Sequence, residues 1–463
     1  MSDRLTRRAF LSHSGKTAAG IAAGLSASTL LRDARGAEAN EKFQIALIGC
    51  GGMGRYKLGN FMDSKLCDVV AVCDVDESHA AGAAEDVKKK LGTTPRQVKD
   101  YRNVCDMKEI DIVIVATPDH WHAIPMLTAV AAGKDVYCEK PCCHNIKEGR
   151  AMVDAAKKHK RVVQVGTHQR SIPHIQQARD FVRAGKLGTV SMTQTFTYGN
   201  ESPDGMGQPK AEPVPPGVDY DMWLGPAPVH EFNRHRFHGS WRWFFDYAAG
   251  MVGDWNVHLQ DIIMWTMGVT APVSVSTSGG KLILTDDRDT PDVMQAVYEF
   301  GPCANAPKGF VHTYTMRKVS GKPWDAGGYG MDFNATNGLL HLTRDQWRIE
   351  ADRENWSKPD SPFRIEGFKK DFPGADGNAH LAHVMNFLEC VRSRGTPIAS
   401  IESHFNTVAA CHLANVSLRV GRKIFWDARK EQCFKDRELT IPDAEANQLL
   451  TREYRKGYEL PVA

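Results

Sequence analysis

The segment that most constrains the fold of this chain is a glycine-rich turn near its N-terminus. Residues 43–48 (FQIALI) form a short run of strand-forming apolar side chains, and residues 49–54 (GCGGMG) follow directly. A G-x-G-x-x-G pattern between a strand and a helix is typical of a turn that binds a dinucleotide. There, Gly49 permits the tight bend, Gly51 lets the backbone approach the pyrophosphate, and Gly54 permits close packing of the helix on the strand. The helix N-terminus adds a partial positive charge that attracts phosphate.

A second strand supports this interpretation because it ends in a carboxylate at the expected distance. Residues 69–73 are apolar and end at Asp74, about 20 residues after Gly54. A carboxylate there accepts hydrogen bonds from the adenosine ribose and would repel a 2′-phosphate, so we expect NAD rather than NADP. A helix-capping or turn role is the alternative for Asp74. The expected cofactor contacts in this region are Gly49, Gly51, Gly52, Met53, Gly54 and Asp74.

Three further strand-like runs extend the same pattern. Residues 112–116, 135–138 and 161–165 are short apolar runs, and helix-like stretches follow the first two. This alternation predicts an α/β fold with a doubly wound parallel sheet, a Rossmann domain over residues 40–168. Ligands of such sheets bind beyond the carboxyl ends of the strands. The polar motifs at these ends are Thr117-Pro118-Asp119-His120-Trp121-His122, Glu139-Lys140-Pro141 and Gly166-Thr167-His168-Gln169-Arg170.

The second half of the chain lacks that strict alternation of strands and helices. Alternating side chains predict three strands, and apolar residues at helical spacing predict two helices. These elements are strands at 190–198, 273–278 and 293–300 and helices at 380–394 and 402–419. Proline- and glycine-rich composition predicts loops at 202–217 and 356–378.

A carboxylate and a histidine follow one another at helical spacing in residues 250–261 (GMVGDWNVHLQD). On a helix, Asp254 and His258 lie on one face, and Asp261 extends that face. A carboxylate beside a histidine raises the basicity of the imidazole and fixes its tautomer, as a general base requires. A half-buried histidine that Asp254 merely holds in place is the alternative. We expect no metal here, because no third histidine stands at zinc-like spacing.

An aromatic stretch precedes this motif. It contains Phe237, Trp241, Trp243, Phe244, Phe245 and Tyr247, interleaved with Arg236 and Arg242. The apolar C–H faces of sugars stack on aromatic rings, and arginine can donate hydrogen bonds to their hydroxyls. Core packing is the ordinary role of such rings, so we expect only one or two, Trp243 among them, to contact a substrate.

Four of these motifs together resemble those of the Gfo/Idh/MocA oxidoreductases, which include glucose–fructose oxidoreductase, inositol dehydrogenases and other sugar dehydrogenases. They are the glycine turn, Thr117-Pro118 with His122, Glu139-Lys140-Pro141, and Asp254-x-x-x-His258, and the resemblance spans about residues 43–430. Asn256 departs from the pattern, because the family commonly has glycine there. The resemblance implies a C-terminal α+β domain over residues 169–440 with a large, open, mainly antiparallel sheet, followed by a tail over 441–463.

The resemblance also implies roles for residues. It indicates an NAD(P)-dependent dehydrogenase, with NAD as cofactor, acting on a secondary alcohol of a sugar, sugar derivative or polyol. The hydroxyl proton would leave to His258, oriented by Asp254, while Lys140 stabilises the alkoxide; a surface lysine is the alternative for Lys140. The further residues implied are Thr117, Pro118, His122, Glu139 and Lys140 for the cofactor, and His168, Gln169, Arg170, Trp243 and Asp261 for the substrate. A homo-oligomer, dimer or tetramer, is expected by the same analogy.

Composition excludes some classes of function. Lys and Arg total 58 against 55 acidic residues, a net charge of +3, and no basic cluster favours a nucleic-acid partner. The 11 cysteines lack paired C-x-x-C spacing, and Cys142 and Cys143 are adjacent, which suits neither zinc nor a disulfide framework. We therefore expect mostly reduced core thiols, including Cys50, Cys73 and Cys138.

The N-terminus predicts export. Residues 6–11 (TRRAFL) resemble a twin-arginine signal, an apolar run at 18–31 follows, and residues 37–39 (AEA) suit a cleavage site. We expect a signal over residues 1–39 and a periplasmic or equivalent location; a leader on a cytosolic enzyme is the alternative. No later segment approaches the roughly 18 consecutive apolar residues of a membrane span, so the mature form is expected to lie outside the membrane.

Export has a consequence for the chemistry, because free NAD is scarce outside the cytoplasm. We expect a tightly held NAD that is reduced and reoxidised within one active site. Paired oxidation and reduction of two sugars, epimerisation through a keto intermediate, and redox-assisted glycoside cleavage all satisfy this. The alternative to a dehydrogenase is therefore an NAD-dependent glycoside hydrolase that works through transient C3 oxidation and elimination. A binding protein that lost catalysis is a further alternative, disfavoured by the presence of Asp74, Lys140 and His258.

Overall fold

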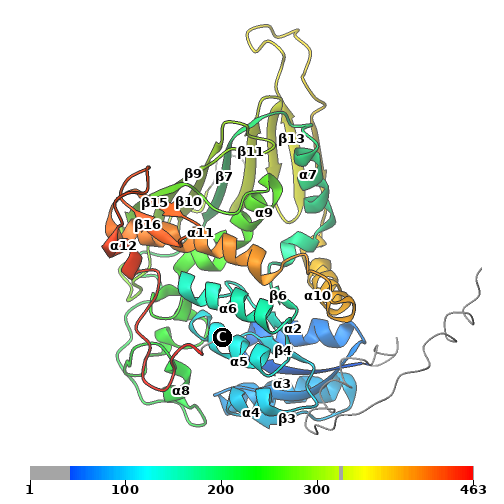
Figure 1. Ribbon diagram of the computed structural model, residues 1–463, viewed down its shortest axis with the longest axis vertical. Coiled ribbons are helices and arrows are strands. Elements are labelled where there is room, and N and C mark those ends of the chain that lie inside the picture. The colour runs from blue at the N-terminus through cyan, green and yellow to red at the C-terminus, as the bar shows by residue number, and fades with distance from the viewer. Residues whose placement is uncertain (1–41, 323–326, 462–463) are drawn as a thin grey trace, which may run out of the picture. The chain divides into compact units, whose positions relative to one another are not determined.

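The described part of the chain carries two β-sheets with helices between them (Figure 1). The computed structural model describes residues 42–322 and 327–461. The predicted export signal, residues 1–39, lies outside the described residues.

The first sheet has six strands, all parallel, in the order β3-β2-β1-β4-β5-β6. Its strands are β1 (Phe43–Ile48), β2 (Cys67–Cys73), β3 (Arg96–Val98), β4 (Ile112–Val115), β5 (Asp135–Cys138) and β6 (Val163–Val165). Its helices are α2 (Gly52–Asp63), α3 (Glu77–Leu91), α4 (Tyr101–Asp106), α5 (Ala123–Ala131) and α6 (Ile146–Lys158). The strand order reverses between β1 and β4, which places a ligand crevice at their carboxyl ends.

This sheet confirms the predicted Rossmann fold. All four residues of β4 (Ile-Val-Ile-Val) are buried, as a central parallel strand between two helical layers requires. The sequence patterns missed β3, whose three residues include two exposed polar side chains and show no periodicity. Side-chain caps fix the helix starts, since Asp76 accepts from Ser78 N at α3 and Asn145 accepts from Glu148 N at α6.

The second sheet has ten strands in the order β14-β13-β12-β11-β7-β10-β9-β8-β15-β16. They are β7 (Val190–Tyr198), β8 (Ser274–Gly280), β9 (Val293–Phe300), β10 (Phe310–Arg317), β11 (Tyr329–Ala335), β12 (Gly338–Leu342), β13 (Gln346–Ala351), β14 (Phe368–Asp371), β15 (Ile424–Asp427) and β16 (Gln432–Phe434). Only the β7–β10 pair is parallel, so the expected large, mainly antiparallel sheet is confirmed.

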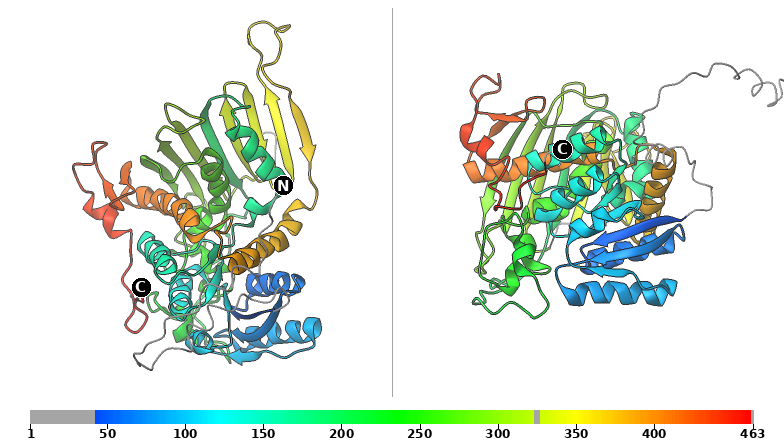
Figure 2. Two further views of the ribbon diagram at one scale, coloured as in Figure 1. Left: turned by 45° about the vertical axis from the view of Figure 1, so that its right-hand side comes forward. Right: turned by 60° about the horizontal axis from the view of Figure 1, so that its bottom comes forward.

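Helices cover one face of this sheet and join it to the first (Figures 1 and 2). They are α7 (Pro173–Arg183), α9 (Val257–Met267), α10 (Ala375–Ser393) and α11 (Ile401–Val420). Helices α7, α9 and α11 pack on the sheet, α11 also contacts α6, and α10 contacts α2 of the Rossmann half. Val384, Phe387 and Leu388 of α10 therefore belong to the same buried cluster as β1 and α2.

The remaining elements are short and lie mostly in connecting segments. They are η1 (Asp119–Trp121), η2 (His168–Ser171), α8 (Tyr220–Leu224), η3 (Arg234–Arg236), η4 (Ser240–Trp243), η5 (Val252–Asn256) and α12 (Ala444–Gln448). The predicted loop at 202–217 contains no helix or strand. The predicted loop at 356–378 is wrong in part, because it contains the edge strand β14 and the first turn of α10. Within the described ranges, no helix is long and apolar enough to span a membrane.

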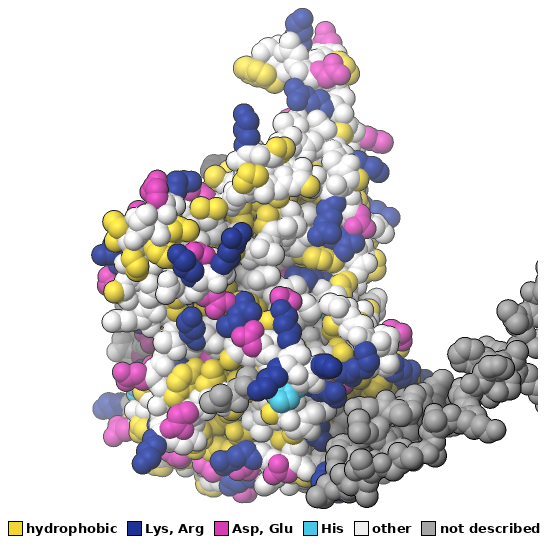
Figure 3. Space-filling model, viewed as in Figure 1, with side chains coloured by type: hydrophobic (Ala, Val, Ile, Leu, Met, Phe, Trp, Pro, Cys, Tyr) yellow, Lys and Arg dark blue, Asp and Glu magenta, His cyan; other side chains and the backbone are white. Residues whose placement is uncertain are grey.

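The thiols are buried, as predicted for core cysteines. All 11 cysteines are free, and only Cys303 is not fully buried. On the face shown in Figure 3, Lys and Arg side chains are interspersed with Asp and Glu rather than gathered in one patch.

Candidate functional site

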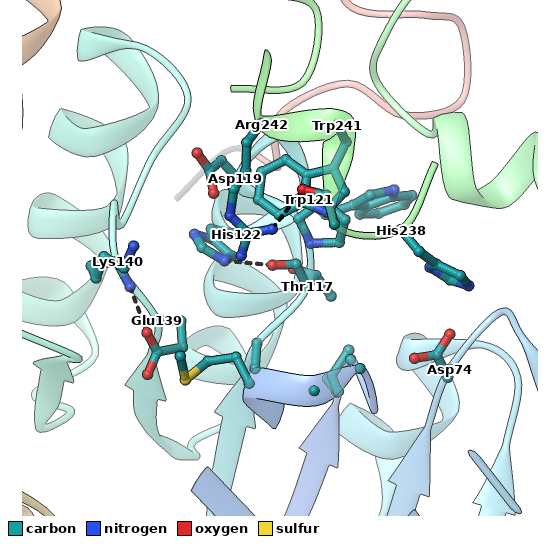
Figure 4. A pocket seen from close by; sticks show the side chains of 18 of the residues that line it. Asp74, Thr117, Asp119, Trp121, His122, Glu139, Lys140, His238, Trp241 and Arg242 are labelled. Carbon is teal, nitrogen blue, oxygen red and sulfur yellow. Dashed lines mark hydrogen bonds between the residues drawn. The ribbon is translucent and has the colours of Figure 1, made fainter. Parts of the chain in front are cut away.

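A cavity of about 570 Å³ follows the carboxyl ends of β1, β2, β4 and β5 (Figure 4). Asp74 lies at one end, and Lys140 lies at the other. Side chains from the second half of the chain, His238, Trp241 and Arg242 among them, line the same cavity. A ligand bound there would therefore contact both halves of the protein.

The glycine turn has the geometry that its sequence predicts. Gly49 has φ +92°, and a Cβ on it would lie 2.6 Å from the backbone of Ala116. A Cβ on Gly54 would lie 1.9 Å from Gly49 O, so this glycine permits the close packing of α2 and does not line the cavity. Added Cβ atoms on Gly51 and Gly52 would meet no protein atom within 4 Å, so their backbone is open to the cavity.

Asp74 ends β2 and is held in a fixed orientation. One carboxylate oxygen accepts from Cys50 N at 2.7 Å, and the other accepts from Asp76 N at 2.9 Å. Asp74 therefore has the turn role considered as its alternative. It also lines the cavity, and each carboxylate oxygen has a second lone pair for a ligand hydroxyl.

The motif after β4 combines ligand-facing and bracing residues. Thr117, Pro118 and His122, which were predicted to contact the cofactor, line the cavity. His122 is also a brace, because its Nδ1 lies 2.6 Å from Pro141 O and its Nε2 lies 2.8 Å from Thr117 O. It thereby joins the loops that follow β4 and β5.

Lys140 and Asp254 form the central ion pair of the site. Lys140 Nζ donates to Asp254 Oδ1 at 2.9 Å and to Asp254 O at 2.8 Å, and Arg242 Nε lies 3.2 Å from the same Oδ1. Burial alone would raise the pKa of Asp254, but Lys140 and then Arg242 lower it to about 2. Glu139 is buried behind Lys140, with its Oε1 3.5 Å from Lys57 Nζ.

The expectation that Asp254 orients His258 is not met in this structure. Residues Val252–Asn256 form a π-helical turn before α9, so residues four apart are not stacked as on a regular α-helix. No hydrogen bond joins the two side chains, and His258 Nδ1 is buried without a partner among the described residues. Burial, followed by the charges of Lys140 and Arg344, holds the pKa of His258 well below its usual value, the opposite of the predicted increase.

Of the predicted substrate residues, only His168 lines the cavity. Arg170 and Asp261 form a buried bidentate pair, with Nε–Oδ2 at 2.7 Å and Nη2–Oδ1 at 2.6 Å. Gln169 lies behind Arg344 and can accept from its Nε at 2.8 Å. The Trp243 ring lies under the Arg288 guanidinium at 5.3 Å. These four residues are not among those that line the cavity, and each has a partner within the protein.

Several cavity residues were missed by the sequence analysis. They are Asp119, Trp121, His238, Trp241, Arg242, Trp255, Arg344 and His380. Asp119 and Trp121 lie within the quoted Thr-Pro motif, and Trp241 and Arg242 within the aromatic stretch, so local signals existed for them. No local signal marks Arg344 or His380, which come from the β12–β13 turn and α10.

Two clusters bring two histidines and an aspartate within 4.8 Å of one another, namely Asp76, His79 and His238, and His168, Asp376 and His380. In both, the imidazoles stack, with ring centroids 4.1 Å apart for the first pair and 3.7 Å for the second. Ring-nitrogen lone pairs lie in the ring planes, so stacked rings do not aim at one common ion. The Lys57 ammonium also lies 2.7 Å from His380 Nδ1. Neither cluster is arranged to hold a metal.

Family models match both halves of the chain. Residues 43–167 match the Gfo/Idh/MocA model described as an oxidoreductase family, NAD-binding Rossmann fold, and residues 174–295 match the C-terminal alpha/beta domain of the same family. Together these matches cover more than half of the sequence. The chain belongs to the Gfo/Idh/MocA oxidoreductase family.

Individual relatives share this family. The rhizopine catabolism protein MocA of Rhizobium meliloti is 30% identical over 203 residues, which are 42% of this chain and 57% of the relative. An inositol 2-dehydrogenase of Salmonella typhimurium is 26% identical over 185 residues, 39% of this chain and 54% of the relative. The chain spans about half the length of the curated relatives it matches.

Solved structures share the fold. A levoglucosan dehydrogenase in complex with NADH has a TM-score of 0.61 at 19% identity, covering 83% of this chain and 98% of that one. The WlbA dehydrogenase from Bordetella pertussis, in complex with NADH and UDP-GlcNAcA, has a TM-score of 0.62 at 15% identity, covering 84% and 99%.

The cavity of this Gfo/Idh/MocA protein fits NAD, the cofactor of its Rossmann domain. The bare backbone at Gly51 and Gly52 lies at the N-terminus of α2, where phosphate binds. Asp74 lies where the adenosine ribose would be bound. Thr117 Oγ1 is a buried polar atom of a cavity-lining residue with no partner in the described chain, so it is available to a ligand.

Proposed function

We propose that this protein is an NAD-dependent dehydrogenase that acts on a secondary alcohol of a sugar, sugar derivative or polyol. The observation that carries the proposal is the Lys140–Asp254 ion pair beside His258, in the same cavity as the glycine turn. The names of the relatives, an inositol 2-dehydrogenase and a levoglucosan dehydrogenase, support a polyhydroxylated substrate.

The residues of the site have complementary tasks in this reaction. Bound NAD supplies the acceptor for the hydride that leaves the carbinol carbon. Lys140, held by Asp254, donates a hydrogen bond to the substrate oxygen and stabilises its developing negative charge. His258 is neutral at pH 7 because of its lowered pKa, so its ring can accept the hydroxyl proton.

We further propose that the protein is exported by the twin-arginine route and holds its NAD tightly. The TRRAFL motif in residues 6–11 supports export. Retention is supported by the lining of the cavity, which comes from both halves, and by the contact of His238 with Asp76 at 2.9 Å, which joins the two halves beside it. A closed redox cycle would then need no external NAD.

The experiment is to purify the folded protein without added cofactor, denature it and identify released nucleotides by mass spectrometry. Near-stoichiometric NAD or NADH is expected. NADP would contradict the role given to Asp74, and an empty protein would contradict tight retention. NADH formation on added NAD with myo-inositol, levoglucosan, glucose or methyl glucoside then tests the dehydrogenase activity itself.

We also propose a homo-oligomer built on the ten-stranded sheet. Its helices lie on one face only, and the β13–β14 connection projects from it (Figure 1) with Trp356 90% and Phe363 55% exposed. Light scattering of the purified protein should give the mass of a dimer or tetramer, and a monomer at micromolar concentration would contradict the proposal.

A further inference from the structure

A buried acidic residue of the site has no task in the reaction described above. Asp119 begins the short turn η1 after β4, is only 5% exposed and lines the cavity. Figure 4 shows it in the group of cavity-lining side chains that contains His122 and Arg242.

The ordinary structural roles of an aspartate do not account for Asp119. Its side chain does not cap η1, whose N-cap is Pro118. It enters no ion pair with any residue of 42–322 or 327–461, because both nearby cations, Lys140 and Arg242, bind Asp254 instead. No hydrogen bond to its carboxyl group is found in those ranges either. Because the residue lines the cavity and its carboxyl group has no partner in the described protein, that group is available to a ligand that enters the cavity.

Burial favours the neutral form of Asp119 over its ionised form. The groups that face it are Lys140 and Arg242, which stabilise a negative charge, and Asp254 and Cys143, which oppose one. Burial outweighs the two cations and raises the pKa of Asp119 well above its usual value. The two carboxyl groups thus differ, because direct contacts with Lys140 and Arg242 favour the ionised form of Asp254, whereas burial favours the protonated form of Asp119.

We propose that Asp119 is a substrate-binding residue whose neutral carboxyl group donates a hydrogen bond to a carbohydrate hydroxyl next to the carbon that is oxidised. The position follows from its neighbours, because Lys140, which would donate to the reacting oxygen in the proposed reaction, also faces Asp119. A carboxylic acid presents one donor and one acceptor, which matches a hydroxyl group that both accepts and donates. The inference rests on the proposed dehydrogenase function and adds a determinant of its specificity.

The test compares Asp119→Asn with Asp119→Ala in the purified, NAD-loaded protein. Asparagine has the shape of a neutral carboxyl group and still donates and accepts, whereas alanine does neither. We expect Asp119→Ala to lower kcat/KM at least about tenfold on myo-inositol, levoglucosan, glucose or methyl glucoside, whichever the parent oxidises best. Asp119→Asn should retain clearly more activity than Asp119→Ala.

The pH profile gives a second readout, which a merely structural role would not change. Because the protonated form binds, the parent's kcat/KM should decline as pH rises through the raised pKa of Asp119. Asp119→Asn cannot lose that proton and should lack this decline. The exposed carboxylate of Asp106 provides a matched control, and Asp106→Asn should keep the parent's profile.

The outcomes separate this inference from the proposed function. Equal activity of Asp119→Ala and the parent, or an Asp119→Asn variant with the parent's high-pH decline, would overturn the role of Asp119 while the dehydrogenase stands. A parent that neither oxidises any of the four compounds nor binds one, measured by fluorescence of bound NADH, would overturn both. Equal nucleotide content and Tm in all variants would confirm that folding does not explain the differences.

Discussion

At the scale of single residues, the site is a buried set of charges that fix one another's protonation states. Asp254 Oδ1 accepts hydrogen bonds from both Lys140 and Arg242, so one carboxylate positions two cations at the end of the cavity. Burial, followed by the charges of Lys140 and Arg344, lowers the pKa of His258 rather than raising it, and no carboxylate of the described residues is hydrogen-bonded to that ring. In the proposed reaction, His258 would be the neutral acceptor of the hydroxyl proton, and the Lys140 cation would stabilise the developing negative charge on the substrate oxygen.

Removing that cation should abolish most of the activity. We expect Lys140→Ala to lower kcat by about 10²–10³-fold, the usual effect of losing one donor to a developing oxyanion. Steady-state NADH formation measures it, and Lys147→Ala, at an exposed lysine of α6, is the control. Full activity in Lys140→Ala would refute the catalytic assignment.

The protonation of His258 predicts a pH dependence. Activity requires the neutral ring, and burial, Lys140 and Arg344 lower its pKa, so the acid limb of kcat/KM should lie below the usual histidine value of about 6.5. Arg344→Met removes one of these charges, so the pKa of His258 should rise and the acid limb should move to higher pH. An acid limb that does not move would show that another group controls it.

At the scale of secondary-structure elements, two local distortions shape the cavity. The glycine turn brings β1, β4 and α2 closer than any side chain would allow. The π-helical turn η5 directs Asp254 toward Lys140 instead of toward His258. Each distortion lies where an element ends at the cavity, as is common at functional sites.

The packing of the glycine turn can be tested within one helix. A Cβ at Gly54 would lie 1.9 Å from Gly49 O, so Gly54→Ala should lower Tm and reduce the NAD content of the purified protein. Gly59, also in α2, has open space around an added Cβ, and Gly59→Ala should stabilise the helix by about 0.5–1 kcal/mol. If Gly54→Ala retained both Tm and NAD, the close approach would not be required.

At the scale of the whole molecule, a buried ion pair links elements that are distant in sequence. Arg170 of η2 binds Asp261 of α9, and Thr407 of α11 donates to the same carboxylate at 3.0 Å. The side chains of Arg170 and Asp261 are only 3% and 0% exposed. Arg170, Asp261 and Thr407 thus join three elements through one buried carboxylate, which gives a structural role to two residues that were predicted to contact the substrate.

Breaking the Arg170–Asp261 pair should lower the stability of the protein more than it weakens substrate binding. Arg170→Met leaves Asp261 buried without its partner and should lower the free energy of unfolding by about 3–5 kcal/mol. The double variant Arg170→Met/Asp261→Leu should recover much of that loss, measured by urea denaturation. A raised KM with unchanged stability would instead support the substrate role.

The Rossmann half was predictable, because its signals are local. Strand, turn and helix follow one another within residues 43–63. The four apolar residues of β4 (Ile-Val-Ile-Val) indicate by themselves that this strand is buried. In the second sheet, by contrast, strands such as β14 (Phe-Lys-Lys-Asp) carry mixed polar sequences. Their pairing depends on neighbours far along the chain, which no local periodicity encodes.

The sequence alone determined the fold class, the glycine turn, the position of Asp74 and the presence of Lys140 at a strand end, since each depends on residues close together in the chain. Only the tertiary structure decided which distant side chains meet. It paired Asp254 with Lys140, buried Arg170 against Asp261, and brought Arg344 and His380 to the cavity. Contacts and burial of this kind arise only when distant elements pack together, and they shift the pKa values of the side chains in the site.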